Sequence, residues 1–284
     1  MRHNYIIKRL YLILILCISY SLCYADIELR FGLYASDRPS DLVKKFRPVI
    51  NLIEQRLTQQ LEQKVSINFV MAPTYSQGIN QLANGEIDFM RIGPASYVLA
   101  YKQNPAIQIL AAESNKGKKT FKGIICVKQN SSIQTIQDLR GHSFAFGDKH
   151  STIGRYLSQQ FLVEKGIHAK DLEKYKYFGS HDKVGAIVGL GIFDAGALKA
   201  STYKKLIKKG VPLRKLAEFN NITKPWVARA GLEPKITAAL KNVLLNIKNH
   251  KALKKLKKDG FLQATHDDYK SIRIAIEKNS EFFE

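Results

Sequence analysis

The chain is poor in cysteine, which excludes a fold held together by disulfide bonds. Only three of its 284 residues are cysteines, and two of them, Cys17 and Cys23, lie near the N-terminus. Cys126 is the third, and its apolar surroundings predict an inert, buried thiol. A chain of this length can bury a full hydrophobic core and needs no such cross-links.

Long hydrophobic runs are lacking as well, which argues against a membrane-spanning helix. The apolar run at residues 10–18 is too short for a span, which takes about 20 residues. It follows a basic N-terminus and precedes Cys23-Tyr24-Ala25, a segment that is small at both ends, as secretory cleavage requires. This arrangement predicts a cleaved signal peptide at residues 1–25 and a periplasmic protein, with a retained N-terminal anchor as the alternative.

Acidic residues are scarce compared with basic ones. The chain has 24 Asp and Glu against 45 Lys and Arg, for a formal net charge of +21, and +18 remains once residues 1–25 are removed. Such a surplus attracts anions, whether small ligands, nucleic acid or lipid headgroups. We expect no nucleic-acid binding, because a secreted protein meets little nucleic acid and the sequence has no aromatic–basic recognition module.

The usual sequence signatures of catalysis and metal binding are missing too. There is no cluster of metal ligands, no motif with paired carboxylates and no nucleophile elbow, and His181 has no recognised nucleophile beside it. We therefore expect a binding protein with no cofactor and no metal. An enzyme built on a binding-protein fold is the alternative.

What is present is an alternation of strand-like and helix-like segments, which predicts an α/β fold with mainly parallel sheets flanked by helices. Residues 27–34 have the pattern of a strand, and residues 41–60 have apolar side chains at helical spacing. The same order of elements starts again after Gly123. A chain of this length forms one large domain or two ordinary ones.

A weak internal repeat indicates two similar lobes. In each copy, an aromatic residue after a strand is followed by a short helix, a glycine, a strand with an aspartate and finally a tyrosine. Loops that follow parallel strands are where ligands bind in open α/β sheets, so we expect both copies to contribute to one cleft. We expect the two aspartates to fix loops rather than touch ligand. The offset is 106 positions in four pairs: Tyr75 and His181, Gly85 and Gly191, Asp88 and Asp194, Tyr97 and Tyr203.

Ser151 and Thr152 mark a change from strand to helix in the stretch FGDKHSTIGRYLSQQF. Hydroxyl residues at such a point cap the helix by accepting the free N–H groups of its first turn. A helix N-terminus is also a seat for a small oxyanion. The local sequence favours capping and leaves the anion site open.

Four motifs, in their order, resemble those of the periplasmic substrate-binding proteins of phosphate/phosphite/phosphonate ABC transporters: GEIDF with GPASYV, FAFGD with STIG, GSHD, and DAGA. The resemblance covers residues 27–261. It implies a two-lobed periplasmic-binding-protein fold (type II-like) whose hinge the chain crosses twice, near residues 121–123 and 217–221. The expected segments are 26–121 for the first part of lobe 1, 122–216 for lobe 2, and 217–284 for the return to lobe 1 and the C-terminal helices.

The resemblance also implies a ligand site and a partner. Ser151 and Thr152 would contact the oxygens of a phosphonate, phosphite or phosphate, together with backbone N–H groups of the same turn, which includes Ile153. Tyr75, Tyr97 and His181 would complete the site from the two lobes. Without the resemblance, the two tyrosines are more typical of a core edge, and His181 serves equally well as a helix cap. The partner would be an ABC permease in the inner membrane, and we expect a monomer.

Three residues depart from the family pattern. Ile153 stands where a third hydroxyl is common, Lys199 where an acid or a small polar residue is frequent, and Arg91 where an apolar residue is typical. Because a lysine repels an ammonium group, we expect a small oxyanion without an amine. The alternative is that Lys199 points to solvent and that Asp182 or Asp148 binds an amine. A ligand-sensing role for a membrane kinase or cyclase is the alternative to transport.

Overall fold

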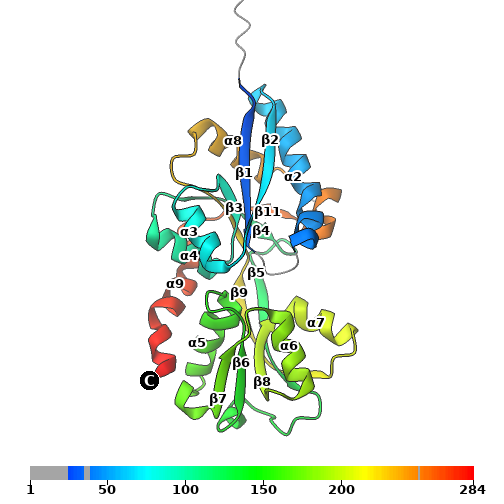
Figure 1. Ribbon diagram of the computed structural model, residues 1–284, viewed down its shortest axis with the longest axis vertical. Helices are drawn as coiled ribbons and strands as arrows, with labels where there is room; N and C mark the ends of the chain where they lie inside the picture. Colours follow the sequence, from blue (N-terminus) through cyan, green and yellow to red (C-terminus); the bar gives the residue numbers. More distant parts are fainter. Residues whose placement is uncertain (1–24, 35–38, 249) are drawn as a thin grey trace, which may run out of the picture.

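The computed structural model describes residues 25–34, 39–248 and 250–284, which form two α/β lobes stacked along the long axis of the molecule (Figure 1). Lobe 1 is built on a six-stranded sheet and lobe 2 on a five-stranded sheet, each flanked by helices. No helix within these ranges is both long and apolar enough to cross a membrane. The predicted signal peptide, apart from Ala25, lies outside the described residues.

Lobe 1 combines the N-terminal part of the chain with the part that follows residue 224, and its sheet has the order β11-β4-β10-β3-β1-β2. The buried ring of Trp226 stacks on Phe31 at 4.9 Å between centroids and lies 6.3 Å from Phe46 of helix α2. Helix α2 packs here because its apolar residues share one face. The strands are β1 (Ile27–Tyr34), β2 (Val65–Ala72), β3 (Phe89–Arg91), β4 (Gln108–Ser114), β10 (Pro225–Ala228) and β11 (Gly260–Leu262), and the helices are α2 (Pro39–Leu61), α3 (Tyr75–Ala83), α4 (Pro94–Gln103), α8 (Pro234–Leu245) and the 3-10 segment η4 (Lys251–Leu256).

Lobe 2 is formed by the middle of the chain, and its sheet has the order β7-β6-β8-β5-β9. Cys126 of β5 is fully buried in its core, and burial raises the pKa of the thiol to about 12, which agrees with the predicted inert thiol. The strands are β5 (Thr120–Lys128), β6 (Ser143–Phe146), β7 (Lys174–Tyr177), β8 (Ala195–Lys199) and β9 (Leu213–Ile222), the helices are α5 (Leu157–Val163), α6 (His181–Leu190) and α7 (Ala200–Lys208), and the short segments are η1 (Gln137–Leu139), the π-helical η2 (Thr152–Tyr156) and η3 (Ala169–Asp171).

Both sheets are mixed and not mainly parallel as the sequence predicted, for a reason that lies in the hinge. Strand β1 is parallel to β2 and β3, and β6 is parallel to β7 and β8. Strands β5 and β10 are antiparallel to both of their neighbours. These are the strands by which the chain enters each lobe from the other, so they run away from the junction while their neighbours run toward it. The edge strand β11 also runs antiparallel to β4.

Two short connections join the sheets. Residues 115–119 lead from β4 to β5, and residues 223–224 lead from β9 back to β10. The connections are paired, because the Thr223 amide donates to the Lys119 carbonyl at 2.8 Å and the Glu113 amide donates to the Lys224 carbonyl at 3.0 Å. The stretches in which we expected the crossings, 121–123 and 217–221, lie a few residues away, inside β5 and β9.

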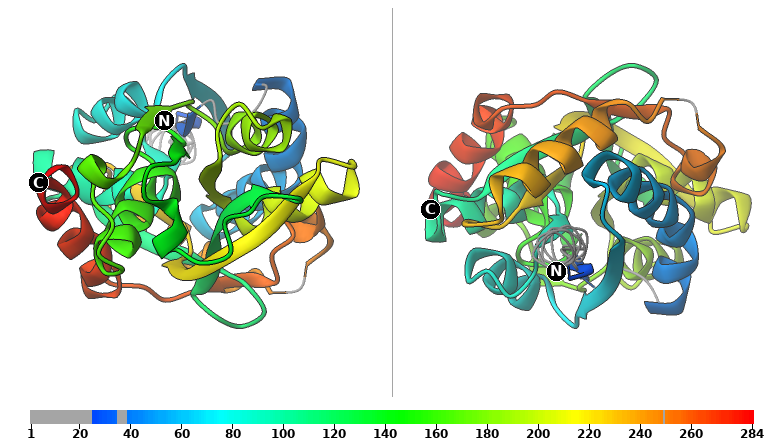
Figure 2. Two further views of the ribbon diagram at one scale, coloured as in Figure 1. Left: turned by 90° about the horizontal axis from the view of Figure 1, so that it is seen from below. Right: turned by 90° about the horizontal axis from the view of Figure 1, so that it is seen from above.

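The C-terminal segment adds a third link between the lobes, which the sequence did not indicate. It consists of η5 (His266–Tyr269), α9 (Lys270–Glu277) and η6 (Lys278–Phe283), and it runs along one side of the molecule, opposite α7 (Figure 2). Helix α9 packs against α4 of lobe 1, whereas η6 packs against α5 of lobe 2. Phe282 is buried beside Phe146, with 5.5 Å between ring centroids, and the side-chain Nδ2 of Asn279 donates to Gln159 Oε1 at 2.8 Å.

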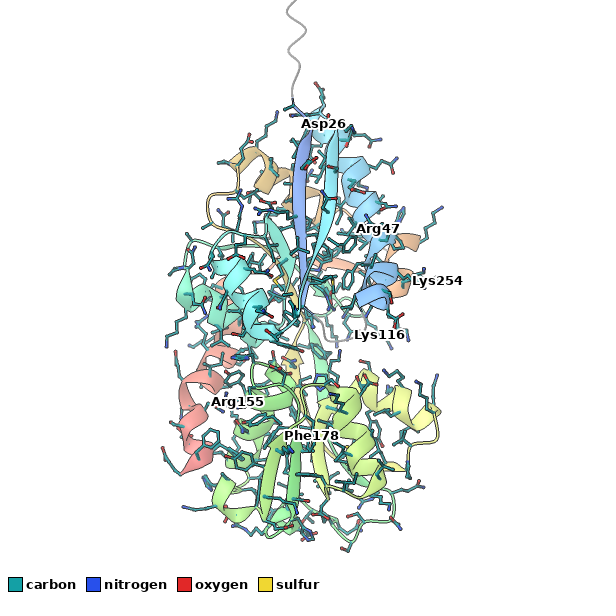
Figure 3. The ribbon with its side chains drawn as sticks, viewed as in Figure 1. Asp26, Arg47, Lys116, Arg155, Phe178 and Lys254 are labelled. Carbon is teal, nitrogen blue, oxygen red and sulfur yellow. The ribbon has the colours of Figure 1, made fainter. Side chains whose placement is uncertain are left out.

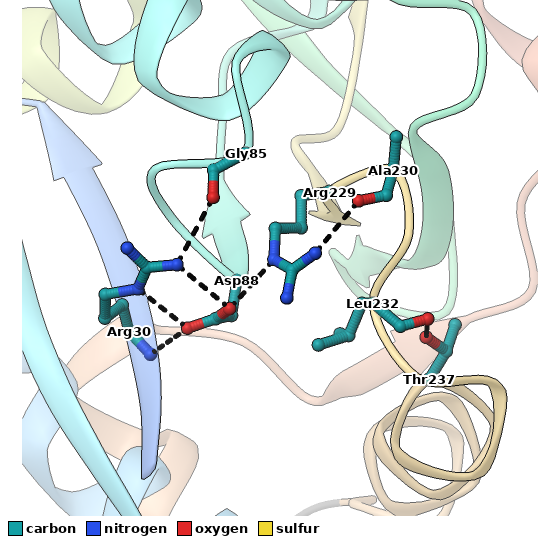
Figure 4. Close-up of polar contacts among 7 residues, drawn as sticks. All are labelled: Arg30, Gly85, Asp88, Arg229, Ala230, Leu232 and Thr237. Carbon is teal, nitrogen blue, oxygen red and sulfur yellow. Dashed lines mark hydrogen bonds and ion pairs between the residues drawn. The ribbon is translucent and has the colours of Figure 1, made fainter.

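The internal repeat is visible in the structure. Tyr75 and His181 are the first residues of α3 and α6, and the glycines that follow these helices both have positive φ angles, 77° and 79°. The two aspartates do the same work in each lobe: Asp88 Oδ2 accepts the Arg30 amide, and Asp194 Oδ2 accepts the Ser143 amide, both at 2.8 Å. Asp88 also binds the Arg30 and Arg229 guanidinium groups (Figure 4). Both aspartates therefore fix loops, as expected.

Candidate ligand-binding cleft

The ends of strands from both lobes face each other where the lobes meet. In lobe 1, β2 and β3 lead into the N-termini of α3 and α4, and in lobe 2, β6 and β8 lead into those of η2 and α7. Helix N-termini carry free N–H groups and partial positive charge, so this junction favours anions. Lys116, in the connection from β4 to β5, lies at the level of the junction between the two lobes (Figure 3).

Ser151 and Thr152 bring two hydroxyl groups to this junction. Ser151 is the N-cap of η2, and its Oγ accepts the Gly154 amide at 3.0 Å. Thr152 Oγ1 accepts the amide of Ala95 in lobe 1 at 2.9 Å, so this bond crosses between the lobes. Each hydroxyl oxygen is thus already used as an acceptor, which leaves its O–H free to donate to an anion. Capping and anion binding are therefore compatible here.

The backbone of the same turn supplies further donors. The amides of Thr152 and Ile153 have no acceptor among the residues that the structure describes. The Ile153 side chain is only 2% exposed and packs in the core. Ile153 can therefore donate its backbone N–H to a ligand, but it lacks the side-chain donor that a hydroxyl residue at this position would supply.

Two stacked tyrosines line the lobe 1 side, and only one of them was predicted. Tyr75 stacks on Tyr34, the last residue of β1, with 4.0 Å between ring centroids. Tyr34 Oη accepts the Gly93 amide at 2.7 Å, and a side chain at Gly93 would meet this oxygen at 2.6 Å. Position 93 therefore requires glycine. The place of Tyr34 at the end of a strand is the sequence signal that could have identified it.

His181, the first residue of α6, faces the turn between β6 and η2 that holds Ser151 and Thr152. Its Nδ1 is buried and has no hydrogen-bond partner among the described residues. A side chain at Gly147 would come within 3.7 Å of this nitrogen, which places the ring over the turn between β6 and η2. Burial, together with the charges of Lys199 and Lys224, lowers the pKa of His181 well below its usual value. A neutral imidazole beside the turn can share a hydrogen bond with a ligand without adding charge.

Tyr97 lies apart from these groups. Its ring is 1% exposed and packs edge-on against Tyr269, and its hydroxyl forms a 2.9 Å hydrogen bond with His266 Nδ1. The structure thus uses Tyr97 to hold the C-terminal segment on α4. We do not assign it a ligand contact, in contrast to the expectation from the sequence.

Arg91 and Glu113 form a buried pair close to the cleft. Two bonds join them, from Arg91 Nε to Oε1 at 2.6 Å and from Nη2 to Oε2 at 3.1 Å, and Lys258 Nζ lies 3.5 Å from the same carboxylate. Burial alone would raise the pKa of Glu113, but the charges of Arg91 and Lys258 outweigh it and lower the pKa to about 2. Arg91, which stands where the family pattern has an apolar residue, is therefore neutralised by the Glu113 carboxylate.

No group of three or more His, Cys, Asp or Glu residues able to hold a metal occurs in the part of the chain that the structure describes. The donors at the junction are hydroxyls, amides and imidazole, which suit an oxyanion. Two α/β lobes that meet at such a junction define the class of two-lobed solute-binding proteins. Residues 31–269 match the family of periplasmic phosphonate substrate-binding proteins of ABC transporters, and the chain belongs to this family.

Curated relatives and a solved structure agree with this assignment. The chain is 29% identical over 266 residues to a probable ABC transporter phosphite binding protein, PhnD1, of Prochlorococcus marinus (strain MIT 9301), which covers 86% of this chain and 87% of the relative. The structure of that organism's PhnD1 in complex with methylphosphonate is similar, with a TM-score of 0.76 and 27% identity over 89% of this chain and 98% of the other. The phosphate-import protein PhnD of Mycolicibacterium smegmatis is 25% identical over 62% of this chain and 56% of its own length. The family is periplasmic and serves transport together with an ABC permease.

Proposed function

We propose that this chain, after cleavage of residues 1–25, captures a small tetrahedral oxyanion between its lobes and delivers it to an ABC permease of the inner membrane. The ligand class is phosphonate, phosphite or phosphate. The observation that carries the proposal is the turn at Ser151 and Thr152, in which both hydroxyl oxygens already accept backbone amides and so keep their O–H groups available as donors.

The number of donors is sufficient for tight binding. The turn offers two hydroxyl groups and two amides, and Tyr75 and His181 flank it. A hydrogen bond to a charged group contributes about 1.5–3 kcal/mol, and micromolar affinity corresponds to about 8 kcal/mol. A handful of such bonds therefore suffices after the cost of ordering the ligand and the lobes.

The names of the relatives support the same ligand class. PhnD1 of Prochlorococcus marinus is named a phosphite binding protein and was solved with methylphosphonate, and PhnD of Mycolicibacterium smegmatis is named a phosphate-import protein. These ligands share a tetrahedral phosphorus with at least two anionic or hydrogen-bonding oxygens, which is the feature that a ring of N–H and O–H donors recognises.

The test is a calorimetric titration of phosphite, phosphate and methylphosphonate into wild-type protein and Thr152→Ala. We expect Thr152→Ala to weaken binding at least about tenfold, because it removes one donor to a charged group. The matched control is Thr237→Ala: Thr237 is 8% exposed against 6% for Thr152, and its hydroxyl donates to the Leu232 carbonyl in lobe 1 (Figure 4). Equal affinities of the two variants would contradict the assignment of the turn.

The processing, assembly and chemistry of the protein can be checked on the same material. We expect the N-terminal residue of protein isolated from the periplasm to be Asp26, directly before β1. Light scattering should give the mass of a monomer with and without ligand. We expect phosphonates incubated with the purified protein to be recovered unchanged, and release of phosphate would support an enzyme instead.

A further inference from the structure

Three cationic side chains lie around the cleft on three different elements. Arg91 ends β3, Lys199 ends β8, and Lys224 lies in the second connection between the lobes. Lys224 Nζ is 5.7 Å from the centre of the Tyr34 ring, so it sits at the tyrosine stack that lines lobe 1. Its charge also acts on His181 in lobe 2. Lys224 is thus placed between the lobes, in the hinge itself.

The acid near Lys224 is already engaged. Glu113 is the carboxylate whose charge acts on Lys224, but both of its oxygens bind Arg91, and Lys258 lies 3.5 Å away. Burial, followed by the charges of Arg91 and Lys199, lowers the pKa of Lys224 well below its usual value. A half-buried cation next to other cations is unfavourable unless an anion joins them.

The tetrahedral group of the ligand does not need these lysines. The turn at Ser151 and Thr152 already supplies hydroxyls and amides for it. Of the two described aspartates that could hold an ammonium group, Asp182 pairs with Lys205 at 2.5 Å, and Asp148 accepts the His150 amide at 2.7 Å with one of its oxygens. Among the described side chains whose charge acts on Lys224, Arg91, Lys199 and Lys45 are cationic and only Glu113 is anionic.

We propose that the cleft has a second anion subsite, formed by Lys224 with the aid of Lys199, and that it prefers phosphonates with another acidic group, such as a carboxylate, on their carbon side. This inference rests on the proposed function, because the Ser151–Thr152 turn must hold the phosphonate end. Closure of the lobes would bring Lys199 of lobe 2 and Lys224 of the hinge to the same end of the ligand.

The first test compares phosphonoacetate with ethylphosphonate, which has the same two-carbon chain without the carboxylate oxygens, by calorimetry on wild-type protein. A charged hydrogen bond to Lys224 should make phosphonoacetate bind about tenfold to a hundredfold more tightly. The preference should persist at high salt, because a contact pair is screened much less than a distant charge. 2-Aminoethylphosphonate should bind more weakly than ethylphosphonate.

The second test removes the lysine. Lys224→Met keeps most of the apolar stem and should abolish the preference, with the dissociation constant of ethylphosphonate changed by no more than about threefold. The matched control is Lys165→Met: Lys165 Nζ also lies over an aromatic ring, 5.9 Å from the centre of Phe161, but just beyond the end of α5 that is remote from the cleft. It should leave the preference intact. Circular dichroism and the melting temperature show whether each variant is folded. If Lys224→Met does not fold, the comparison of phosphonoacetate with ethylphosphonate on wild-type protein still tests the second subsite.

The outcomes separate the two proposals. If no oxyanion binds to wild-type protein, the proposed function fails. If methylphosphonate or phosphite binds but phosphonoacetate binds no more tightly than ethylphosphonate, the second subsite is refuted and the proposed function stands. An equal loss of affinity for both ligands in Lys224→Met also overturns the subsite, because the lysine would then serve the phosphonate group itself.

Discussion

Glu113 is the carboxylate whose loss should affect the stability of this protein most clearly. Its side chain is 2% exposed, and those of its partners Arg91 and Lys258 are each 15% exposed, which makes these the two most buried ion pairs among the described residues. Glu113→Gln keeps the size of the side chain but leaves Arg91 and Lys258 without a counter-charge. Breaking a buried pair by removing one partner costs about 3–5 kcal/mol.

The pKa of Glu113 gives a second measure of the same effect. The pKa lies at about 2 in the folded protein, compared with an ordinary value of 4.5. Since a tenfold change in proton affinity is worth about 1.4 kcal/mol, the ionised carboxylate contributes about 3 kcal/mol. Because the folded-state pKa is lowered, this contribution is present above pH 4.5 and is lost as the pH falls from 4.5 to about 2.

Thermal and urea denaturation of wild-type protein and Glu113→Gln, each from pH 7 down to pH 2.5, measure the effect. At pH 7 we expect the variant to melt roughly 6–12 °C lower, at about 2–4 °C per kcal/mol for a chain of this size. The difference should shrink as the pH falls below 4.5. The control is Glu218→Gln, which removes an exposed carboxylate that pairs with Lys215, and its melting temperature should change little. Equal melting temperatures of the two variants, or a gap between wild type and Glu113→Gln that does not depend on pH, would refute the reasoning.

Three further predictions concern other parts of the molecule. Saturating ligand should reduce the radius of gyration in small-angle scattering, because rotation about residues 115–119 and 223–224 closes the lobes; an unchanged profile would indicate a rigid cleft. Phe282→Ala should cost about 3–5 kcal/mol, because it empties a site 1% exposed, whereas Phe283→Ala, at a position 43% exposed, should cost much less; similar losses would contradict the docking of the C-terminal segment on lobe 2. Cys126 should resist thiol reagents at pH 8 in native protein and react on unfolding, because burial raises its pKa to about 12; fast labelling of native protein would show that it is accessible.

The sequence predicted well those features that depend on neighbours along the chain. Ser151 caps η2 as its residue type predicted, because its Oγ accepts the amide three residues away. The alternative of His181 as a helix cap was wrong by one position, because Ser180 is the cap and His181 is the first residue of α6. The alternation of strands and helices gave the α/β class for the same reason. The repeat with offset 106 predicted two lobes, because each copy folds into the same local unit.

The sequence was less informative where the partner lies far along the chain. The family resemblance implied that Tyr97 contacts the ligand, but its hydroxyl meets His266, 169 positions later. Periodicity shows that one face of a helix is buried and does not say against what. The same limit applies to Arg91, which stood out as a departure until the structure showed Glu113 beside it on a neighbouring part of the sheet.

By itself, then, the sequence determined the local units of this protein: its helix starts, its loops fixed by aspartates, and the Ser151–Thr152 turn with its spare donors. Only the tertiary structure decided how these units meet. It placed the Ala95 amide against Thr152 across the lobes, Lys224 over the ring of Tyr34, and Phe282 in the core of lobe 2. The physical reason is that hydrogen bonds within a turn are set by residue types a few positions apart, whereas contacts between lobes depend on how the two sheets and their connections are packed in space.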